Sequence, residues 1–526
     1  MNRLSSYTNR NTYRSFSLND GGARKKVRAE WIPSARTYVH GNPTGAGVCP
    51  RWVILKNSGK LEDDDEDSNS CSAAAAEANT AATSLTSAGH PFRVSFRLEA
   101  PPAASRLRFR CFACTDRRPV PCMRVVAAHR DAVLVVLGYQ ERFSSRYVHD
   151  YFVYNAGAGA ADPPRPPSLS LLPPYHRLTL HEANGETYQR RRRPWPMPHM
   201  LKEATTGLLR RGEDDLVVAD LVVIKDDDLV DEDTPDEDED EDDIVDECTS
   251  KEGELLVLRS GEWSITRTPI IHDDGKAGEL SSWKTDMVVP VGDRQLCWVN
   301  LYRGVILCDL SDETPKLRYL SLPVKPPDGK FDDDRYGDNP RGCPTMDRTV
   351  CVTNGGAVLK FIDIFPRCCC GSPGATLCDH SIGAFVVNTW TLGMDDDMAW
   401  TMDAMVDATE LLSLDAFPRV NLEHPVMSID DPNLICFVVP EKHKQGKMKY
   451  CFSETIWKIM VDTTSKTLVS VSRYDNSSEQ QPFPGYNYLP SKIPDYFIAS
   501  YGNYSNGATK SPAIVDRPQV ATKIVV

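Results

Sequence analysis

Two groups of cysteines have the spacing that comes closest to a metal site. One is Cys111-Phe112-Ala113-Cys114 with Cys122, and the other is Cys368-Cys369-Cys370 with Cys378 and His380. A structural zinc site needs four ligands in tetrahedral geometry, usually from two paired spacings. The first group has three cysteines and no nearby histidine, and the adjacent cysteines of the second cannot all point at one ion. We therefore expect ordinary thiols here, and neither a metal nor a cofactor.

Motifs for catalysis are missing from the sequence. It has no Gly-x-Ser-x-Gly elbow, no phosphate-binding Gly-Lys-Ser/Thr loop and no His-Glu-x-x-His pair. The runs Asp332–Asp334 and Asp395–Asp397 lack the alternate ligand spacing and the glycine turn of a calcium loop, so they are interpreted as solvated loops. No catalytic residue is identified. The question of an enzyme stays open, with the sequence leaning against one.

Charge is unevenly distributed along the chain. The formal net charge is -14, and much of the excess lies in residues 62–67 and 231–247. The rest is near balance, which argues against nucleic acid as the main partner because phosphate contact needs a basic face. One dense basic cluster, Arg190–Arg193, precedes Pro194-Trp195-Pro196. It could be a nuclear import signal, a salt partner of residues 231–247 or an exposed loop between structural units.

The composition also indicates the cellular compartment in which the protein is expected. The 16 cysteines make up a small share of a chain of 526 residues, so free thiols in a reducing compartment are expected. No apolar run reaches the length of a membrane span, and we expect no membrane partner. Residues 1–30 are basic and rich in Ser and Asn, as in a flexible leader or an organellar transit peptide. The predicted location is intracellular, in the cytoplasm or nucleus, with organellar targeting as the alternative.

Tyr302 and Arg303 are the candidate partner-binding residues. They occupy the expected turn between two apolar strands, where Asn, Asp or Gly is more usual. Tyr and Arg are also enriched among the residues that anchor protein interfaces. The alternative is structural: Tyr302 would fold back over a neighbouring unit, and Arg303 would pair with an acid such as Asp309.

The strands that must position this turn form a meander. Gln295 to Leu301 alternates between apolar and polar residues, Val305 to Cys308 is a continuous apolar run, and Lys316 to Leu322 alternates again. Gly304 closes the turn, and we expect it to supply the positive φ of a tight hairpin. The sequence therefore predicts three short antiparallel strands, with Trp298 to Leu301 paired to Val305 to Cys308.

A loose repeat extends this pattern along the chain. Asn155, Asp309 and Asp462 each end a strand signal, and each is followed by a turn and a Leu-rich strand. About twenty strand signals, at four per blade, predict roughly five to seven blades. The predicted fold class is mainly all-β, a propeller-like array of four-stranded antiparallel blades with disordered insertions. One short helix is expected over Ala404 to Leu414.

The predicted organisation has three parts: a basic flexible leader (1–47), a propeller-like region (48–475) and a partly irregular closing segment (476–526). Within the second part, residues 62–89 and 226–247 are predicted to be disordered insertions, because such compositions cannot bury enough apolar surface to offset the ordering entropy. The latter is expected to be removable with little effect on the melting temperature.

The string Trp298-Val299-Asn300-Leu301-Tyr302-Arg303-Gly304 and the downstream Leu317 to Pro323 resemble a plant family known as domain of unknown function 1618 (DUF1618), which is greatly expanded in cereals. The resemblance covers about residues 48–475 and is densest over 295–440. It implies a mostly β, propeller-like fold similar to the domains that follow F-boxes, and no established activity. The family more often has Asp where this chain has Asn300. No F-box-like helical segment precedes the region, so a ubiquitin-ligase adaptor role is not supported.

Two functions are compatible with these features. The first is a non-enzymatic module that binds a protein partner through the loops of its blades. The second is a propeller-type hydrolase or sugar-processing enzyme with carboxylates at a central channel. Three or more acids and a histidine converging in one pocket would favour the enzyme, whereas an apolar, aromatic channel mouth would favour the binding module. A rapidly diverging defence or compatibility factor rests on family analogy alone.

Overall fold

The computed structural model describes residues 50–62, 78–111, 120–140, 147–157, 165–175, 199–224, 251–325, 344–366, 385–445, 449–475 and 488–497, apart from residues 213–214, 274, 313, 395–397, 415 and 419. They all belong to Thr37–Val526, the second of two compact units of the chain. The predicted leader, 1–47, and the predicted acidic insertion, 226–247, lie outside the described residues.

Five groups of four consecutive strands form antiparallel sheets, which we call blades 1 to 5. Blade 1 consists of β6 (Cys122–His129), β7 (Ala132–Gln140), β8 (Tyr147–Asn155) and β9 (Ser168–Leu171). Blade 2 consists of β10 (Thr206–Arg211), β11 (Asp215–Val223), β12 (Glu252–Arg259) and β13 (Glu262–Ile271). Blade 3 consists of β14 (Met287–Val291), β15 (Gln295–Asn300), β16 (Gly304–Asp309) and β17 (Leu317–Ser321). Blade 4 consists of β18 (Arg348–Thr353), β19 (Val358–Pro366), β20 (Phe385–Leu392) and β21 (Trp400–Asp407). Blade 5 consists of β22 (Pro425–Met427), β23 (Leu434–Gln445), β24 (Lys449–Asp462) and β25 (Thr467–Asp475).

The sixth sheet, blade 6, joins strands from both ends of the described chain. Its order is β26 (Tyr488–Ser491), β1 (Val53–Lys56), β5 (Ala104–Cys111), β4 (Pro91–Arg97) and β3 (Ala82–Leu85), and β2 (Lys60–Leu61) pairs with β5. β26 lies after residue 475, within the predicted closing segment. A late strand is thus hydrogen-bonded to the first one, as Val53↔Ser491 to Lys56↔Tyr488.

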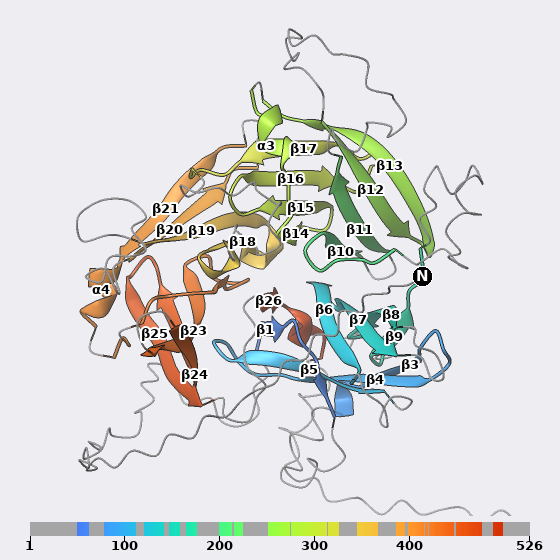
Figure 1. Cartoon of the computed structure of the whole chain (residues 1–526), viewed down its shortest axis with the longest axis horizontal. Coiled ribbons are helices and arrows are strands. Elements are labelled where there is room, and N and C mark those ends of the chain that lie inside the picture. The colour runs from blue at the N-terminus through green and yellow to red at the C-terminus, as the bar shows by residue number, and fades with distance from the viewer. Residues whose placement is uncertain are drawn as a thin grey trace, which may run out of the picture. The chain divides into compact units, whose positions relative to one another are not determined.

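The first strands of the six blades form a closed ring of contacts. β6 contacts β10, and the series continues through β14, β18, β22 and β26 back to β6. Figure 1 shows β6, β10, β14, β18 and β26 on the inner side of their sheets. Blades 2 and 3 also share one eight-stranded sheet, because β13 pairs in parallel with β17. The prediction of a propeller-like, mainly all-β fold is confirmed.

The repeat found in the sequence marks the end of the third strand in blades 1, 3 and 5. Asn155 ends β8, Asp309 ends β16 and Asp462 ends β24. Asp309 Oδ1 accepts a hydrogen bond from Ser311 N at 2.8 Å, and Asp462 Oδ1 accepts from Thr464 N at 2.9 Å. The carboxylate thus stops the strand by forming an Asx turn with the backbone two residues on. The predicted hairpin is also present, with Trp298 opposite Ile306 and Val299 opposite Val305.

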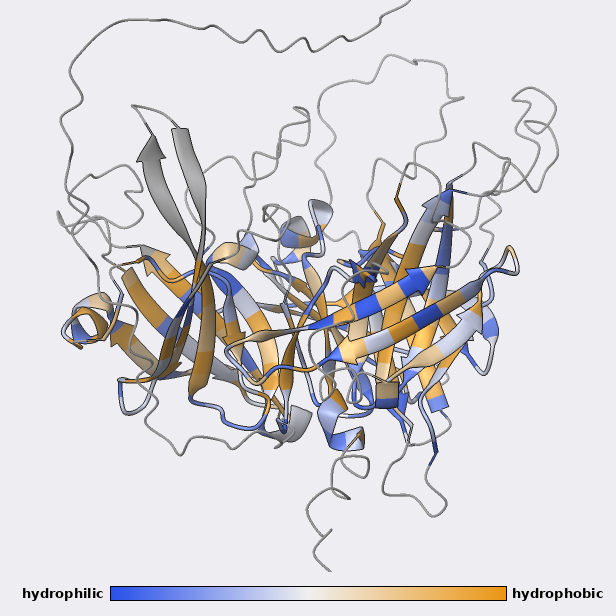
Figure 2. Ribbon diagram, turned by 90° about the horizontal axis from the view of Figure 1, so that it is seen from below, coloured by the Kyte–Doolittle hydropathy of each residue, from blue (hydrophilic) through white to orange (hydrophobic). Residues whose placement is uncertain are grey.

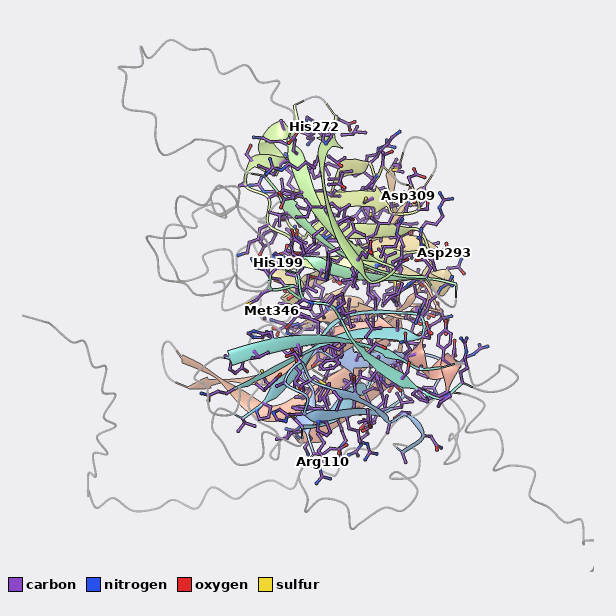
Figure 3. All side chains as sticks on the ribbon, turned by 90° about the vertical axis from the view of Figure 1, so that its right-hand side faces the viewer. Arg110, His199, His272, Asp293, Asp309 and Met346 are labelled. Carbon is purple, nitrogen blue, oxygen red and sulfur yellow. The ribbon has the colours of Figure 1, made fainter. Side chains whose placement is uncertain are left out.

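The ring has two unlike ends. At one end the six inner strands begin, and we call it the loop face; at the other end they turn into the second strands, and we call it the turn face. On the turn face the connections touch one another, as in the bonds Gly292 N to Gly356 O at 2.8 Å and Gly355 N to Ile429 O at 3.0 Å. Figure 3 shows His199 and Met346 on one side and Asp293 and Asp309 on the other, which are the loop and turn faces respectively.

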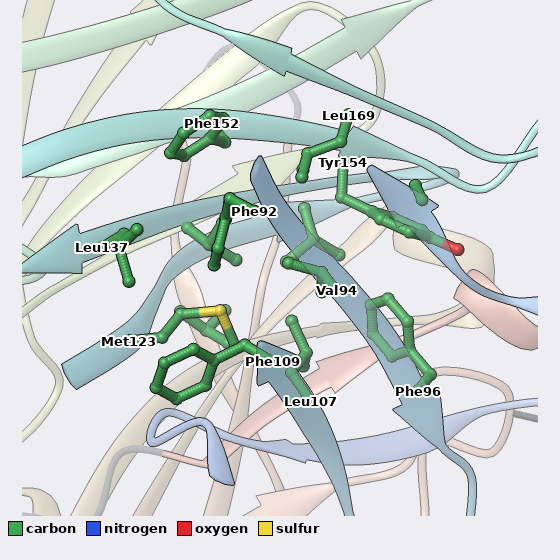
Figure 4. Packing of buried hydrophobic residues seen from close by; sticks show 14 of the residues in the cluster. Phe92, Val94, Phe96, Leu107, Phe109, Met123, Leu137, Phe152, Tyr154 and Leu169 are labelled. Atoms are coloured by element: carbon green, nitrogen blue, oxygen red, sulfur yellow. The ribbon is translucent and has the colours of Figure 1, made fainter. Parts of the chain in front are cut away.

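Apolar side chains fill the spaces between neighbouring blades. Blades 6 and 1 pack through Phe92 against Phe152 and Phe96 against Tyr154, each pair with ring centroids 4.8 Å apart. Figure 4 shows this cluster, and Figure 2 shows apolar residues following the strands. Alternation explains the packing, because every second residue of a strand points to the same face. Cys111, the last residue of β5, is buried in this core, as expected from its inward position.

Three local predictions need correction. The described part has two short α-helices, α3 (Ala277–Ser281) and α4 (Ala408–Leu412), rather than one. The predicted helix over Ala404 to Leu414 begins only after Asp407, because residues up to Asp407 pair in β21 and Asp407 then caps the helix together with Glu410. Part of the insertion predicted over 62–89 is also ordered, since β3 pairs with β4 as Ala82↔Val94 to Leu85↔Pro91. Short 3-10 turns complete the fold at Pro344–Met346, Asn354–Gly356 and Ile493–Tyr496.

Gly304 is required for a different reason from the one predicted. It does not belong to the glycines with positive φ. A Cβ on Gly304 would instead lie 2.4 Å from the carbonyl oxygen of Leu320 and 2.4 Å from the Tyr319 ring. Both neighbours belong to β17, so the glycine is fixed by a close approach across the sheet.

Candidate functional site

The hairpin tip between β15 and β16 holds Tyr302 and Arg303. Asn300 shapes the tip: its Oδ1 accepts a hydrogen bond from Tyr302 N at 3.0 Å, and its carbonyl accepts one from Arg303 N at 3.1 Å. An oxygen acceptor at this position forms an Asx turn, and Asn or Asp can supply it. The departure from the family pattern at Asn300 therefore keeps the turn intact.

The tip lies on the loop face and reaches the next blade. The guanidinium carbon of Arg348, in β18, is 5.6 Å from the centroid of the Tyr302 ring. This distance allows a cation–π contact. Tyr302 and Arg303 are both half-buried. Tyr302 thus leans over blade 4, as the structural alternative stated, while part of its surface stays accessible.

Arg348 links the hairpin tip to the core of blade 4. Its Nε donates to Asp363 Oδ1 at 2.8 Å, and its Nη1 donates to the carbonyl of Leu301 at 3.1 Å. The side chains of Arg348 and Asp363 are only 7% and 5% exposed. Burial raises the pKa of the Asp363 carboxyl, and the charge of Arg348 opposes that rise. The arginine therefore neutralises a buried acid and holds the backbone of the tip at the same time.

The suggested pairing of Arg303 with Asp309 is wrong. Asp309 lies opposite Gln295 at the far end of β16, whereas the tip lies beyond the pair Asn300–Gly304. Five residue steps of extended strand, roughly 17 Å, separate the two positions, which is more than an arginine side chain spans. Asp309 is instead 3.2 Å from Arg294 Nη2 on the turn face.

A pocket lies among the inner strands. Its lining comes from all six blades and consists of Asn57, Val125, Val126, Glu203, Met287, Val288, Thr345, Thr349, His424, Pro425, Val426, Tyr488 and Leu489. Most of these residues stand at or near the beginning of an inner strand, so the pocket belongs to the loop-face end of the ring. Its volume is about 40 Å³, room for about three water molecules.

Glu203 and His424 are the acidic and the imidazole side chain in the lining. Glu203 Oε1 is 2.7 Å from Arg124 Nε, and burial raises the pKa of the Glu203 carboxyl while Arg124 opposes the rise. His424 is buried, and its ring stands edge-on to Tyr488 with centroids 6.4 Å apart. Among the residues that line the pocket there is thus one carboxylate and one imidazole, with Tyr488 as the aromatic ring. The pocket therefore has neither the three acids with a histidine that would favour an enzyme nor the fully apolar, aromatic lining that would favour a binding module.

Comparison with known proteins identifies one segment. Residues 298–436 match the family described as "Protein of unknown function (DUF1618)". The chain carries a DUF1618 region. The region runs from Trp298 in β15 to Cys436 in β23, and so contains the Tyr302–Arg303 tip, Arg348 and all of blade 4. No curated protein matches the chain.

Solved structures resemble the chain only weakly. A Bacteroides uniformis protein assigned as a 6-phosphogluconolactonase has a TM-score of 0.26 at 8% identity, with 82% of this chain and 87% of that one covered. MPT-1, a GDP-Man-dependent mannosyltransferase from Leishmania mexicana, has a TM-score of 0.18 at 9% identity, with 84% and 94% covered. The phage phi92 endosialidase has a TM-score of 0.19 at 8% identity, with 83% and 59% covered. Similarities this low carry no argument about fold or activity.

A half-buried histidine bonded to a buried aspartate lies outside the DUF1618 region and was not predicted. His199 Nε2 is 3.0 Å from Asp220 Oδ2, and Thr206 Oγ1 donates to the other oxygen of Asp220 at 3.3 Å. Asp220 is in β11, and His199 lies on the loop face before β10 (Figure 3). No local spacing relates the two residues, because the pair forms only when β10 and β11 align. A buried carboxylate orients an imidazole in catalytic sites and in structural ion pairs alike, so this pair does not by itself indicate catalysis.

The cysteine groups are only partly visible. Cys111 and Cys122 are described as free thiols, buried and exposed respectively. Cys114, Cys368–Cys370, Cys378 and His380 lie outside the described residues. Within the described ranges, no three or more His, Cys, Asp or Glu side chains gather closely enough to hold a metal ion. In that same part of the chain, no helix has the length and apolar character to cross a membrane.

Proposed function

We propose that the chain is a non-enzymatic interaction module that binds a protein partner at its loop face. The observation that carries the proposal is the unequal length of the connections at the two ends of the ring. Binding residues concentrate in loops that a rigid scaffold positions. A face with several long connections is therefore the better candidate for recognition than a face with mostly short ones.

The long connections begin and end at the loop face. They are residues 172–205 between β9 and β10, 224–251 between β11 and β12, 322–347 between β17 and β18, and 367–384 between β19 and β20. The turn-face connections of blades 1 to 5 are shorter. The longest is residues 156–167 between β8 and β9, and the others have two to seven residues, such as Arg130–Asp131 between β6 and β7, Ser260–Gly261 between β12 and β13, and Gly292–Arg294 between β14 and β15. Loops longer than about 12–15 residues in a compact domain are usually functional or linkers.

Tyr302 and Arg303 are the described loop-face residues that best fit an anchor. Their half-buried state leaves each side chain a surface that a partner can cover, and their types are enriched at binding hot spots. The hydrogen bonds that Tyr302 N and Arg303 N donate to Asn300, together with the contact with Arg348, hold the tip in one conformation. A fixed anchor loses little conformational entropy on binding.

The rival function, a hydrolase or sugar-processing enzyme, receives less support. Glycoside hydrolysis ordinarily uses two carboxylates that flank the bond to be cleaved, and the pocket lining supplies Glu203 as its carboxylate. The cavity of about 40 Å³ is far below the roughly 300 Å³ at which small-molecule sites begin.

The test compares two matched hairpin tips. One variant carries Tyr302→Ser with Arg303→Asn on the loop face, and its control carries Asp293→Ser with Arg294→Asn on the turn face. The control removes the ion pairs of Asp293 with Arg130 at 3.6 Å and of Arg294 with Asp309 at 3.2 Å, and the hydrogen bonds that Arg294 donates to Ser311 Oγ at 3.1 and 2.8 Å. Ion pairs near the surface are worth little. Both full-length proteins are melted thermally and used as bait in native extract with quantitative mass spectrometry.

The proposal predicts that the wild type and the turn-face variant recover a partner protein that the loop-face variant does not recover. The purified partner should bind the purified wild type. Equal recovery by both variants would contradict it. Because Tyr302 also has structural contacts, the single variant Arg303→Asn accompanies the pair. Partner loss that appears only in variants with a lowered melting temperature would assign the tip a structural role.

A further inference from the structure

The connection from β16 to β17 holds a serine whose hydroxyl is bonded to an arginine. Arg294, in the turn between β14 and β15, donates to Ser311 Oγ from Nε at 3.1 Å and from Nη2 at 2.8 Å. A guanidinium presents its N–H groups in a planar fork that matches two oxygens of a carboxylate or a phosphate. Here both donors converge on the single oxygen of a hydroxyl. The arginine is therefore placed to bind a larger, anionic group at the same position.

Two further arginines fasten the backbone beside Ser311 to blade 2. The carbonyl of the peptide bond between Leu310 and Ser311 accepts a hydrogen bond from Arg211 Nη1 at 3.3 Å and another from Arg259 Nη2. Arg211 is paired with Asp215 at 2.5 Å, whereas Arg259 has no carboxylate partner among the described residues. The turn that carries the serine is thus fixed in place, and a guanidinium whose charge no described carboxylate balances lies beside it.

One carboxylate competes for Arg294. Asp309 Oδ2 is 3.2 Å from Arg294 Nη2, and Asp309 Oδ1 accepts hydrogen bonds from Ser311 Oγ at 2.5 Å and from Ser311 N at 2.8 Å. The side chain of Arg294 is 62% exposed, so solvent weakens its attraction to Asp309. A phosphoryl group has a charge of about −1.5 to −2 at pH 7 and three acceptor oxygens. It would therefore attract Arg294 more strongly than the carboxylate does.

The segment around Ser311 is open to a modifying enzyme. It begins at Asp309, which Figure 3 shows at the turn-face end of the molecule. Ser311 is half-buried, and Asp312 and Thr314 are exposed. The local sequence is Asp309-Leu310-Ser311-Asp312-Glu313, with an acid two residues before the serine and two acids directly after it. A protein kinase with a basic substrate groove is complementary in charge to this segment.

We propose that Ser311 is a phosphorylation site and that Arg294 binds its phosphoryl group. The donor is ATP, bound to a separate protein kinase that accepts acidic segments. Ser311 Oγ forms the new bond to the γ-phosphorus, the bond from that phosphorus to the β,γ-bridging oxygen breaks, and ADP leaves. The hydroxyl proton passes to the base of the kinase. Arg294 then exchanges Asp309 for the phosphoryl group, which joins two turn-face connections of blade 3. This site does not depend on the proposed function of the loop face.

The first experiment locates the phosphate. Purified full-length protein is incubated in native extract with ATP and phosphatase inhibitors, recovered and digested with trypsin. Cleavage after Arg303 and Lys316 releases residues 304–316, which contain two hydroxyl acceptors, Ser311 and Thr314. Fragment ions in mass spectrometry distinguish the two. We expect phosphate on Ser311 of the wild type and an unmodified peptide from the Ser311→Ala variant. An unmodified wild-type peptide, or phosphate on Thr314 alone, would overturn the proposal.

The second experiment tests Arg294 with phosphoserine incorporated during translation in place of Ser311 of the full-length protein and titrated by phosphorus NMR. The matched control has phosphoserine in place of the exposed Ser465, whose backbone N likewise donates to the aspartate that ends a third strand, Asp462, at 2.9 Å, and whose hydroxyl lies 2.8 Å from Thr467 Oγ1.

A neighbouring guanidinium favours the dianion, so the phosphoryl group at position 311 should titrate at lower pH than the one at position 465, by at least about half a unit. Arg294→Gln should remove most of that difference at position 311. Equal titration at the two positions, or a difference that Arg294→Gln leaves unchanged, would overturn the assignment of Arg294. A thermal melt of each protein verifies that it is folded.

Discussion

Arg348 lies over the ring of Tyr302, with its guanidinium carbon 5.6 Å from the ring centroid. The two residues belong to neighbouring blades, and the same guanidinium is bonded to Asp363 and to the carbonyl of Leu301. One buried cation therefore fixes the position of the hairpin tip on which the proposed interface rests. The first prediction concerns this cation.

Replacing Arg348 by Met should lower the free energy of unfolding by about 3–5 kcal/mol, because it leaves the buried carboxylate of Asp363 without its counter-charge. Combining Arg348→Met with Asp363→Leu should recover a large part of that loss, since no buried charge then remains. Urea denaturation of the two single variants and the double variant forms the required double-mutant cycle. Additive losses would show that the ion pair does not carry the stability of this junction.

Gly304 gives a second prediction. Gly304→Ala should destabilise the protein by about 1–3 kcal/mol, because the added methyl group would overpack against the β17 backbone and Tyr319. Gly278→Ala is the matched control: nothing lies within 4 Å of its Cβ position, and alanine in a helix is favoured over glycine by about 1 kcal/mol. Thermal melts of both variants check this. If Gly304→Ala melted at the same temperature as the wild type, the close packing of Gly304 against β17 would be refuted.

Comparison of the hairpin with its surroundings shows which features the sequence can reveal. The strands around Trp298 and Val305 were predictable because alternation and a continuous apolar run are local signals. The role of Gly304 was not, since its neighbours Tyr319 and Leu320 come from the next strand. Arg348 with Asp363 and His199 with Asp220 are likewise pairs that only strand register brings together. Blade 6 could not be predicted from local signals either, because β1 and β26, which pair in it, are far apart in the sequence.

A third prediction uses pH. Burial lowers the pKa of His129 from its ordinary 6.5 to about 4, and the charges of Arg130 and Arg210 act in the same direction, whereas Asp293 and a backbone bond to Gly292 oppose it. The folded state thus binds this proton less readily than the unfolded state. The contribution of neutral His129 to the free energy of unfolding is complete above pH 6.5 and falls as the pH drops toward 4. The loss is at most about 3 kcal/mol.

His129→Asn isolates this effect. Its Oδ1 can still accept the hydrogen bond that Arg210 N donates to the ring at 2.8 Å, but it does not titrate. Urea denaturation between pH 4 and 7.5 should show a smaller loss of stability in acid for the variant than for the wild type. Parallel pH profiles would mean that His129 is not buried in its neutral form.

A fourth prediction concerns closure of the ring. A chain ending at residue 475 lacks β26, which pairs with β1, and loses the buried side chains of Ile493 and Phe497. Burial of two such side chains is worth roughly 3–6 kcal/mol, and the β1 backbone also loses its partners. The shortened chain should melt at a much lower temperature and less cooperatively than a chain ending at residue 497. Similar melting curves would show that blade 6 does not need its late strand.

Site-specific photo-crosslinking tests most directly whether the loop face binds a protein partner. A photoreactive phenylalanine analogue is placed at Tyr302 on the loop face or at Asp293 on the turn face of the full-length protein, and crosslinked proteins from native extract are identified. The account predicts one partner, captured from position 302 and absent from position 293, whose capture falls when the unlabelled wild type is added in excess. Capture of the same proteins from both positions, or of a partner from position 293 alone, would contradict it.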